Sequence, residues 1–334
     1  MTDAHRSHRG RRMLGRRLTI AALGGLVAAA VVRSRSGPGR WATGDDPCGP
    51  DGLLLPDGEA RTVITDDGAE LDVLVAGPAH APLVVLPHCW TGTKEMWAPV
   101  ARRLLEGGHR VVLYDQRGHG RSTIGSGPMS IDRLGADLLA VLDDVGGTDL
   151  VLAGHSMGGM TVQALAVNHP EVVRDRVRGI ALVSTAASAM SRPLPAVVVH
   201  RLLGDAASGI LTKRGVGLSR GAVGVRAFES HVRATGDAFA ATSGAARAGF
   251  LVGMSRMDYR AGLASISVPV RVLVGTHDRL TPVARARVLA ERIPGARLDV
   301  LPGFGHMLPL EAPDELADAI TALGALAPVP ATST

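Results

Sequence analysis

Short apolar runs alternate with longer helical stretches from residue 61 to the end of the chain, and this alternation limits the fold more than any other feature. Such an order predicts βαβ units around a mostly parallel sheet, with helices on both faces. The expected strands are residues 61–65, 70–75, 83–86, 110–114, 149–153, 179–184, 270–275 and 298–301. The expected helices are residues 94–106, 131–145, 157–169, 282–293 and 313–326.

The first two strand-like runs differ from the others. Asp66-Asp67-Gly68 separates them, and a short polar turn with glycine between two such runs indicates a β-hairpin. Each of the later runs is compact and mostly apolar, which is typical of strands buried on both faces.

Residues 186–264 interrupt the alternation. They contain apolar helical patches over 194–203, 221–228 and 239–254 but no strand-like run. We expect an inserted helical cap over residues 187–264, above the carboxyl edge of a core built from 61–186 and 265–327. A basic tail (1–40) and a linker rich in Gly, Pro and Asp (41–60) precede this core.

Charge is unevenly distributed. The 334 residues carry a net charge of +5, yet nine of the 36 basic residues and only one acid lie in the first forty positions. The remainder holds 27 basic and 30 acidic residues, a net −3. Nucleic-acid binders concentrate Lys and Arg on their working surface, so this class is disfavoured.

The basic tail contains an apolar run, residues 18–32, with Arg16-Arg17 before it. This order predicts a signal sequence or a membrane anchor, and hence an exported or membrane-associated protein. A disordered basic arm on a cytoplasmic protein is the alternative. The two cysteines, Cys48 and Cys89, do not indicate a disulfide framework, and free thiols are expected.

The segment Gly154-His155-Ser156-Met157-Gly158-Gly159 lies between a predicted strand and a predicted helix. This is the context of a nucleophile elbow. A Cβ atom at Gly154 or Gly158 would collide with its neighbours in so tight a turn, and Ser156 would adopt a strained backbone conformation. The serine hydroxyl would then be exposed at a helix amino terminus, where negative charge is favoured.

A serine nucleophile needs a base, and the base needs an orienting acid. Asp278 follows the predicted strand 270–275, and His306 lies in a Gly-rich loop after the strand 298–301. Both would meet Ser156 at the carboxyl edge of the sheet. Asp278 as a cap for the next helix is less natural than Thr281 in that role, and Asp258 is the rival acid, although no strand precedes it.

With these residues in the order Ser, Asp, His, the chain resembles the α/β-hydrolase superfamily, in particular the capped branch of esterases, monoacylglycerol lipases and cofactor-free haloperoxidases. The resemblance covers roughly residues 61–326. It also includes the loop His88-Cys89-Trp90 and the stretch from Asp115 to Ser122, which is mostly structural in that family.

The resemblance implies an oxyanion hole formed by the backbone N–H groups of Met157 and Trp90. Cys89 stands where the family usually has glycine. It implies hydrolysis of carboxylic esters through an acyl-enzyme, with no metal and no organic cofactor. Apolar cap residues favour an apolar substrate, although they could equally be ordinary helix core. Perhydrolysis by the same triad is the alternative, and a non-catalytic ligand-binding protein is the remote one.

Overall fold

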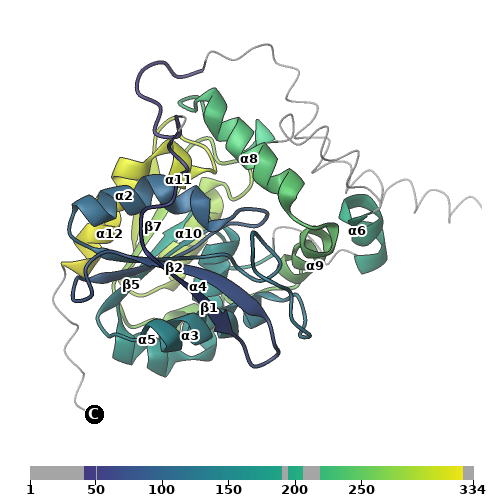
Figure 1. Cartoon of the computed structure of the whole chain (residues 1–334), viewed down its shortest axis with the longest axis horizontal. Coiled ribbons are helices and arrows are strands. Elements are labelled where there is room, and N and C mark those ends of the chain that lie inside the picture. The colour runs from purple at the N-terminus through teal and green to yellow at the C-terminus, as the bar shows by residue number, and fades with distance from the viewer. Residues whose placement is uncertain (1–40, 50, 190–194, 206–218, 326–334) are drawn as a thin grey trace, which may run out of the picture.

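The computed structural model describes residues 41–49, 51–189, 195–205 and 219–325. An eight-stranded sheet crosses the molecule, with the spatial order β1-β2-β4-β3-β5-β6-β7-β8 (Figure 1). Each predicted strand is present, which confirms the expected mostly parallel sheet. The strands are β1 (Glu59–Ile64), β2 (Glu70–Ala76), β3 (Leu83–Pro87), β4 (Arg110–Tyr114), β5 (Leu150–His155), β6 (Val177–Val183), β7 (Val270–Gly275) and β8 (Arg297–Leu301).

The hairpin prediction is also confirmed. β1 pairs antiparallel with β2, from Glu59 opposite Val75 to Ile64 opposite Glu70. β2 is antiparallel to β4, whereas every later pairing is parallel. The carboxyl ends of β3 to β8 therefore lie along one edge of the sheet.

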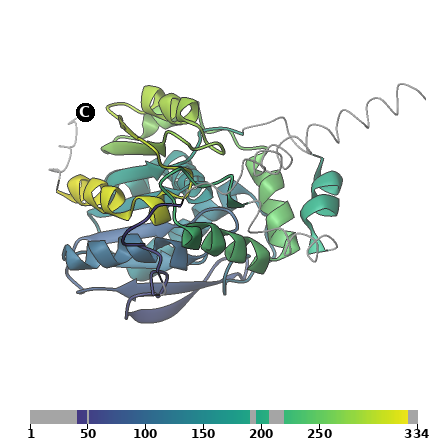
Figure 2. The same cartoon turned by 90° about the horizontal axis from the view of Figure 1, so that it is seen from above.

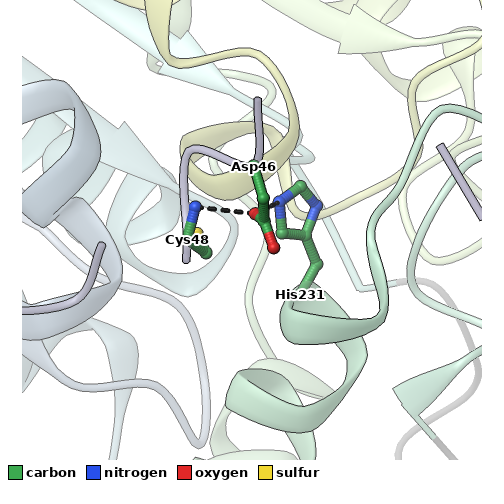
Figure 3. Close-up of side chains that lie close together, drawn as sticks. All are labelled: Asp46, Cys48 and His231. Carbon is green, nitrogen blue, oxygen red and sulfur yellow. Dashed lines mark hydrogen bonds and ion pairs between the residues drawn. The ribbon is translucent and has the colours of Figure 1, made fainter. Parts of the chain in front are cut away.

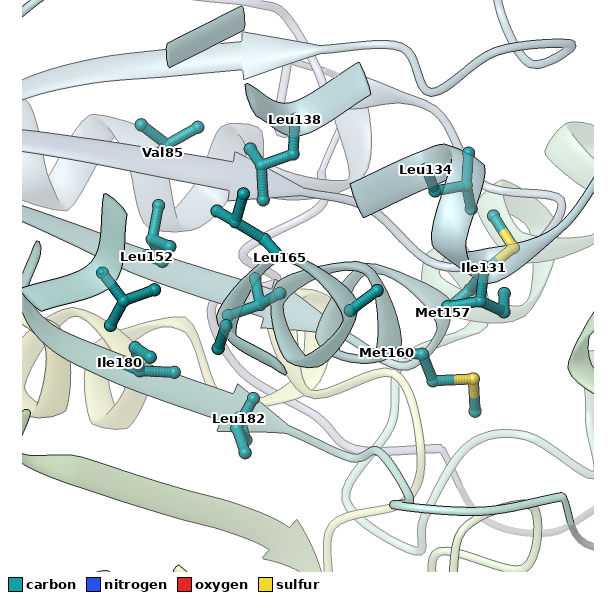
Figure 4. Packing of buried hydrophobic residues seen from close by; sticks show 14 of the residues in the cluster. Val85, Ile131, Leu134, Leu138, Leu152, Met157, Met160, Leu165, Ile180 and Leu182 are labelled. Carbon is teal, nitrogen blue, oxygen red and sulfur yellow. The ribbon is translucent and has the colours of Figure 1, made fainter. Parts of the chain in front are cut away.

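Helices cover both faces of the sheet (Figures 1 and 2). α3 (Ile131–Val145), α4 (Met157–Asn168), α5 (Pro170–Arg176) and α10 (Val283–Arg292) contribute to the apolar layer on one face. Figure 4 shows part of this layer, in which strand residues such as Leu152 and Ile180 face Leu138 and Leu165. α2 (Ala98–Glu106), α11 (Leu308–Glu311) and α12 (Pro313–Gly324) cover the other face.

One predicted helix is interrupted, and another is followed directly by a helix that was not predicted. The stretch 94–106 begins as a 3₁₀ turn, η1 (Lys94–Trp97), before α2, in which Pro99 occupies the first turn. α4 ends at Asn168, and α5 begins at Pro170. Proline is accepted in a first helical turn because its missing N–H would have no intrahelical acceptor there.

Between β6 and β7 lie α6 (Ala196–Leu203), α8 (Glu229–Ala241), α9 (Gly244–Met254) and the short η3 (Leu263–Ser265). α6 packs against α9, as Figure 1 shows. The predicted helix over 221–228 is wrong, because these residues form turns. Their backbone groups form hydrogen bonds with the loop that contains His306 instead of with one another: Ala222 O accepts from His306 N, and Val225 N donates to Gly303 O.

The predicted signal or anchor segment, residues 18–32, lies outside the described residues. Within the described ranges, no helix has the length and apolar character needed to cross a membrane.

Candidate active site

Ser156 stands at the junction between β5 and α4, at the carboxyl edge of the sheet. Its backbone has φ 52° and ψ −112°, a conformation that residues other than glycine rarely adopt. The expected backbone strain is therefore present. The residue is 8% exposed. Its carbonyl accepts a hydrogen bond of 2.7 Å from Thr185 Oγ1, which fixes the turn from the neighbouring strand.

Close backbone contacts surround this turn. A Cβ added at Gly158 would lie 2.1 Å from Pro87 O, and one added at Gly154 would lie 2.3 Å from Gly158 O. Both distances are far inside van der Waals contact, so the expected collisions are confirmed. The same contacts place the end of β3 directly against the start of α4.

Asp278 and His306 come together although 28 residues separate them. His306 Nδ1 lies 2.9 Å from Asp278 Oδ2, and both residues are 4% exposed. A carboxylate only accepts hydrogen bonds, so Nδ1 carries the proton and Nε2 keeps the lone pair that a general base needs. The structure thus joins the predicted acid to the predicted base.

The carboxylate of Asp278 is held by more than the histidine. Oδ1 accepts from the backbone N–H groups of Leu280 (2.9 Å) and Thr281 (2.8 Å), and Oδ2 accepts from Thr281 Oγ1 (2.8 Å). Burial alone would raise the pKa of Asp278, but His306 and the hydrogen bonds from Thr281 outweigh it and lower the pKa. Thr281 therefore binds the carboxylate, and the next helix begins after Pro282 without a side-chain cap.

His155, which precedes the serine, connects the elbow to the base. Its Nε2 donates to His306 O at 2.8 Å, and the two imidazole centroids are 5.1 Å apart. Burial lowers the pKa of His155 to about 3, so the ring is neutral. In the described part of the chain, no hydrogen bond joins the Ser156 hydroxyl to the His306 ring, and the two loops meet through His155.

Sequence reasoning did not identify Glu311, which organises the backbone around His306. Its carboxylate accepts from Gly224 N (2.8 Å), Gly305 N (2.9 Å) and Met307 N (3.1 Å). Burial raises the pKa of Glu311 to about 7, against the lowering effect of these N–H donors. A buried carboxylate between two glycine-containing loops has no local sequence signature.

The loop after β3 lies beside the elbow. Gly92 N donates to Cys89 O at 3.0 Å and closes a tight turn, in which Thr91 has φ 56°. His88 is buried. Its Nδ1 donates to Cys89 O (2.7 Å), while its Nε2 accepts from Gln116 N (2.9 Å). This ring fixes the loop in which Trp90 lies.

Trp90 and Met157 offer backbone N–H groups near the elbow. Met157 is the first residue of α4, so its N–H has no acceptor within the helix. Neither amide donates to another residue of the described chain. The Trp90 indole donates to Arg247 O at 3.2 Å, and its ring meets Phe239 edge-on at 6.1 Å.

Most of the stretch from Asp115 to Ser122 is buried, although Gly120 and Arg121 are exposed. Asp115 and Arg117 do not pair with each other: Asp115 pairs with Lys94 (3.1 Å), and Arg117 with Asp67 (2.7 Å) and Asp137 (2.5 Å). These three ion pairs attach the stretch to different parts of the core.

The rival acid, Asp258, does not face the base. It pairs with Arg260 at 2.5 Å, and the hydrogen bond from Arg260 lowers the pKa of Asp258. Cys48 and Cys89 are both free and buried.

The sequence model that describes the α/β-hydrolase fold matches residues 82–313, more than half of the chain. The chain belongs to the α/β-hydrolase family. The sheet order, the helices on both faces and the strand–turn–helix at Ser156 agree with that membership. The resemblance inferred from the motifs is therefore confirmed, and the protein is an enzyme of this family.

Several curated relatives of this α/β hydrolase align over most of their length. The 3-oxoadipate enol-lactonase 2 of Acinetobacter baylyi is 27% identical, over 79% of this chain and 96% of its own. A bifunctional esterase/perhydrolase of Acinetobacter calcoaceticus is 28% identical, over 74% of this chain and 93% of its own. The crystal structure of the enol-lactonase from Burkholderia xenovorans LB400 is 28% identical, with a TM-score of 0.68 over 79% of this chain and 99% of its own.

Proposed function

We propose that this α/β hydrolase cleaves carboxylic esters, with Ser156 as nucleophile, His306 as general base and Asp278 as the residue that orients the base. The hydrogen bond of 2.9 Å between His306 Nδ1 and Asp278 Oδ2 is the observation that supports this most strongly. It occupies Nδ1 and reserves Nε2 as the proton acceptor, on the loop that His155 links to the serine.

In the first half of the reaction, Ser156 Oγ attacks the ester carbonyl while its proton passes to His306 Nε2. The N–H groups of Met157 and Trp90 donate to the oxyanion of the tetrahedral intermediate. His306 then gives the proton to the leaving alcohol, and the C–O bond breaks to leave an acyl-serine. Water attacks this acyl group, His306 takes a water proton and returns it to Ser156 Oγ, and the acid departs.

The substrate we propose has an apolar acyl or alcohol part. Trp90 and Phe239 are half-buried and in contact, and Trp90 also borders the apolar cluster of Val199, Leu203, Ala248 and Val252. We propose that residues 187–264 act as a cap over the site, with this cluster as part of its wall. Phe250, by contrast, is fully buried in the main core, so we do not expect it to contact the substrate. Enol-lactones are cyclic esters, so the lactonase relatives support the same bond type.

A hydrolysis assay with two serine variants tests the proposal. We expect p-nitrophenyl esters of graded acyl length to be hydrolysed, and Ser156→Ala to abolish turnover. Ser184→Ala is the matched control: this serine also has positive φ (44°) at the end of the neighbouring strand, but is wholly buried. Full activity of Ser156→Ala would overturn the proposal.

The esterase/perhydrolase relative favours one second candidate, perhydrolysis, in which peroxide replaces water in deacylation. The same assay with hydrogen peroxide separates the two, because peracid would form at the expense of the carboxylic acid. If neither product forms with any ester of the panel, both the ester hydrolysis and the perhydrolysis proposals are wrong.

A further inference from the structure

Three potential metal ligands from two distant segments meet away from the proposed triad. Asp46 and Cys48 lie in the segment before β1, and His231 lies in the first turn of α8 (Figure 3). One carboxylate oxygen, the thiol sulfur and one ring nitrogen all lie within 4.8 Å of one another. The cluster thus combines an oxygen, a sulfur and a nitrogen donor.

His231 is the residue that needs an explanation. It is fully buried, and neither ring nitrogen makes a hydrogen bond with a described residue. Nε2 instead faces Asp46 Oδ1 at 3.5 Å, beyond good hydrogen-bond length. Buried imidazoles are normally hydrogen-bonded, so a ring that meets the carboxylate only at this long ion-pair distance offers a nitrogen to a metal ion.

The distances suit a small tetrahedral ion. Ligands about 2.0 to 2.3 Å from Zn²⁺ in a tetrahedron lie roughly 3.3 to 3.6 Å from one another. The nitrogen–oxygen separation of 3.5 Å is already in that range. The sulfur lies within 4.8 Å of the other two atoms, so it needs a shift of about 1.3 Å at most to reach that range. Mixed sulfur, nitrogen and oxygen donors suit Zn²⁺ rather than Mg²⁺ or Ca²⁺, which prefer oxygen alone.

We propose that Asp46, Cys48 and His231 bind one Zn²⁺ ion, with water as the fourth ligand, and that the ion fastens the segment 41–49 to α8. Binding replaces the S–H bond of Cys48 by a Zn–S bond, and the proton leaves to solvent. One ring nitrogen of His231 provides a lone pair to the ion, and the other carries the proton.

Asp46 offers a route for the ion. Its side chain is 25% exposed, whereas His231 is fully enclosed. An open surface hollow of about 500 Å³ is lined by Asp46, Gly49, Asp51, Gly52, Leu54, Leu55, Pro56 and Arg102. The metal would therefore enter from the carboxylate side, where the water ligand would also lie.

The bound ion would stabilise the backbone next to the proposed base, His306. Ala42 N donates to Ala227 O (3.1 Å), and Arg220 stacks over the Trp41 ring at 4.6 Å, so the segment 41–49 already lies along residues 220–231. Ala222 in turn accepts from His306 N at 2.7 Å. If the ion fixes α8, it also fixes residues 220–228 just before the helix, which contact the His306 loop. The proposal does not depend on the substrate or on ester hydrolysis.

Cobalt titration of the full-length, metal-stripped protein tests the site, because thiolate ligation to Co²⁺ gives a charge-transfer absorption and tetrahedral Co²⁺ an intense visible band. We expect one equivalent with both bands, displaced by Zn²⁺. Cys48→Ser should lose the charge-transfer band, and His231→Asn should weaken binding at least tenfold. Cys89→Ser is the control, since Cys89 is buried in the same apolar cluster but lies outside the trio, and it should keep both bands.

Thermal unfolding of the wild type provides a readout that needs no variant. Zn²⁺ at about 100 times its dissociation constant should raise the unfolding midpoint by about 5 °C, and Mg²⁺ should not. His5 and His8 are present in every variant, so any background they contribute is the same throughout. Absence of saturable Co²⁺ binding, an unchanged band in Cys48→Ser, or an unchanged midpoint with Zn²⁺ would each overturn the proposal.

Discussion

The elbow at Ser156 and the loop at His306 are held in different ways. Around Ser156 the backbone is fixed by steric fit, with glycines pressed against Pro87 and a strained φ of 52°. Around His306 the backbone is fixed by buried carboxylates: Asp278 accepts from the ring and from two amides, and Glu311 accepts from three amides.

The two regions should respond to different changes. The steric fit at the elbow does not depend on pH, but adding one carbon atom to a glycine there would disrupt it. A loop organised by buried carboxylates tolerates changes of shape but responds to the loss or neutralisation of charge. Substitutions in the two regions should therefore fail in different ways.

The largest effect is expected for Asp278→Asn. The amide group would favour the other tautomer of His306 and remove the charge that stabilises its protonated form, so kcat should fall by about four orders of magnitude. Steady-state ester hydrolysis measures this. Asp258→Asn is the control, because Asp258 pairs with Arg260, and it should leave kcat within about twofold. Equal losses in both variants would remove Asp278 from the mechanism.

Gly158→Ala should break the elbow. The added methyl group would lie 2.1 Å from Pro87 O, so α4 and the end of β3 must separate, at a cost of about 3 kcal/mol in the free energy of unfolding and most of the activity. Urea unfolding and ester hydrolysis measure the two effects. At Gly324 a Cβ meets only Val151, at an ordinary 3.7 Å, so Gly324→Ala should be neutral or slightly stabilising. A stable, active Gly158→Ala would contradict the steric account.

Glu311→Gln should act as a loss of positioning. An amide group cannot accept from three N–H donors as a carboxylate does, so we expect kcat to fall about 10- to 100-fold with little change in KM. Glu315→Gln, on the exposed side of α12, should leave both constants unchanged. A rise in KM with kcat intact would place Glu311 in substrate binding instead.

The same carboxylate predicts a pH dependence of stability. Because burial raises the pKa of Glu311 from 4.5 to about 7, the folded protein binds this proton more tightly than the unfolded chain. The contribution of Glu311 is therefore complete below about pH 4.5 and is lost as the pH rises to about 7. The unfolding free energy of the wild type, relative to Glu311→Gln, should fall by roughly 3 kcal/mol over that window. If the difference in unfolding free energy between the wild type and Glu311→Gln does not change with pH, the raised pKa of Glu311 is contradicted.

The smallest effect is expected for Thr281→Val. It removes the hydroxyl that donates to Asp278 Oδ2 at 2.8 Å but keeps the shape of the side chain, so kcat should fall about tenfold. Thr281→Ser restores the donor and should recover most of the activity. Equal activity of the valine and serine variants would show that the hydroxyl does not orient Asp278.

Local signals in the sequence were sufficient to predict the sheet, the hairpin and the elbow. Strands β3 to β7 are compact, mostly apolar runs, whereas β8 was expected to be buried on both faces but is partly exposed at the edge of the sheet. The tight turn at Ser156 is encoded by Gly154 and Gly158 within five residues. The pairing of Asp278 with His306 could be predicted because parallel strands bring their carboxyl ends to one edge.

Features that depend on tertiary contacts could not be predicted in this way. Glu311 reaches Gly224 across 87 positions of the chain, and neither residue is unusual locally. The helix expected over 221–228 failed because its backbone groups bond to the His306 loop instead of to one another. Residues 229–238 of α8 went unpredicted because few of them are apolar, and the meeting of Asp46 with His231 depends on how α8 packs.

Labelling with a fluorophosphonate, followed by peptide mass spectrometry, tests the central claim most directly. The account predicts one phosphonyl group per chain, on the oxygen of Ser156, and at least a thousandfold slower labelling when His306 is replaced by Ala. A label on another residue, or an undiminished rate in the His306→Ala variant, would contradict it.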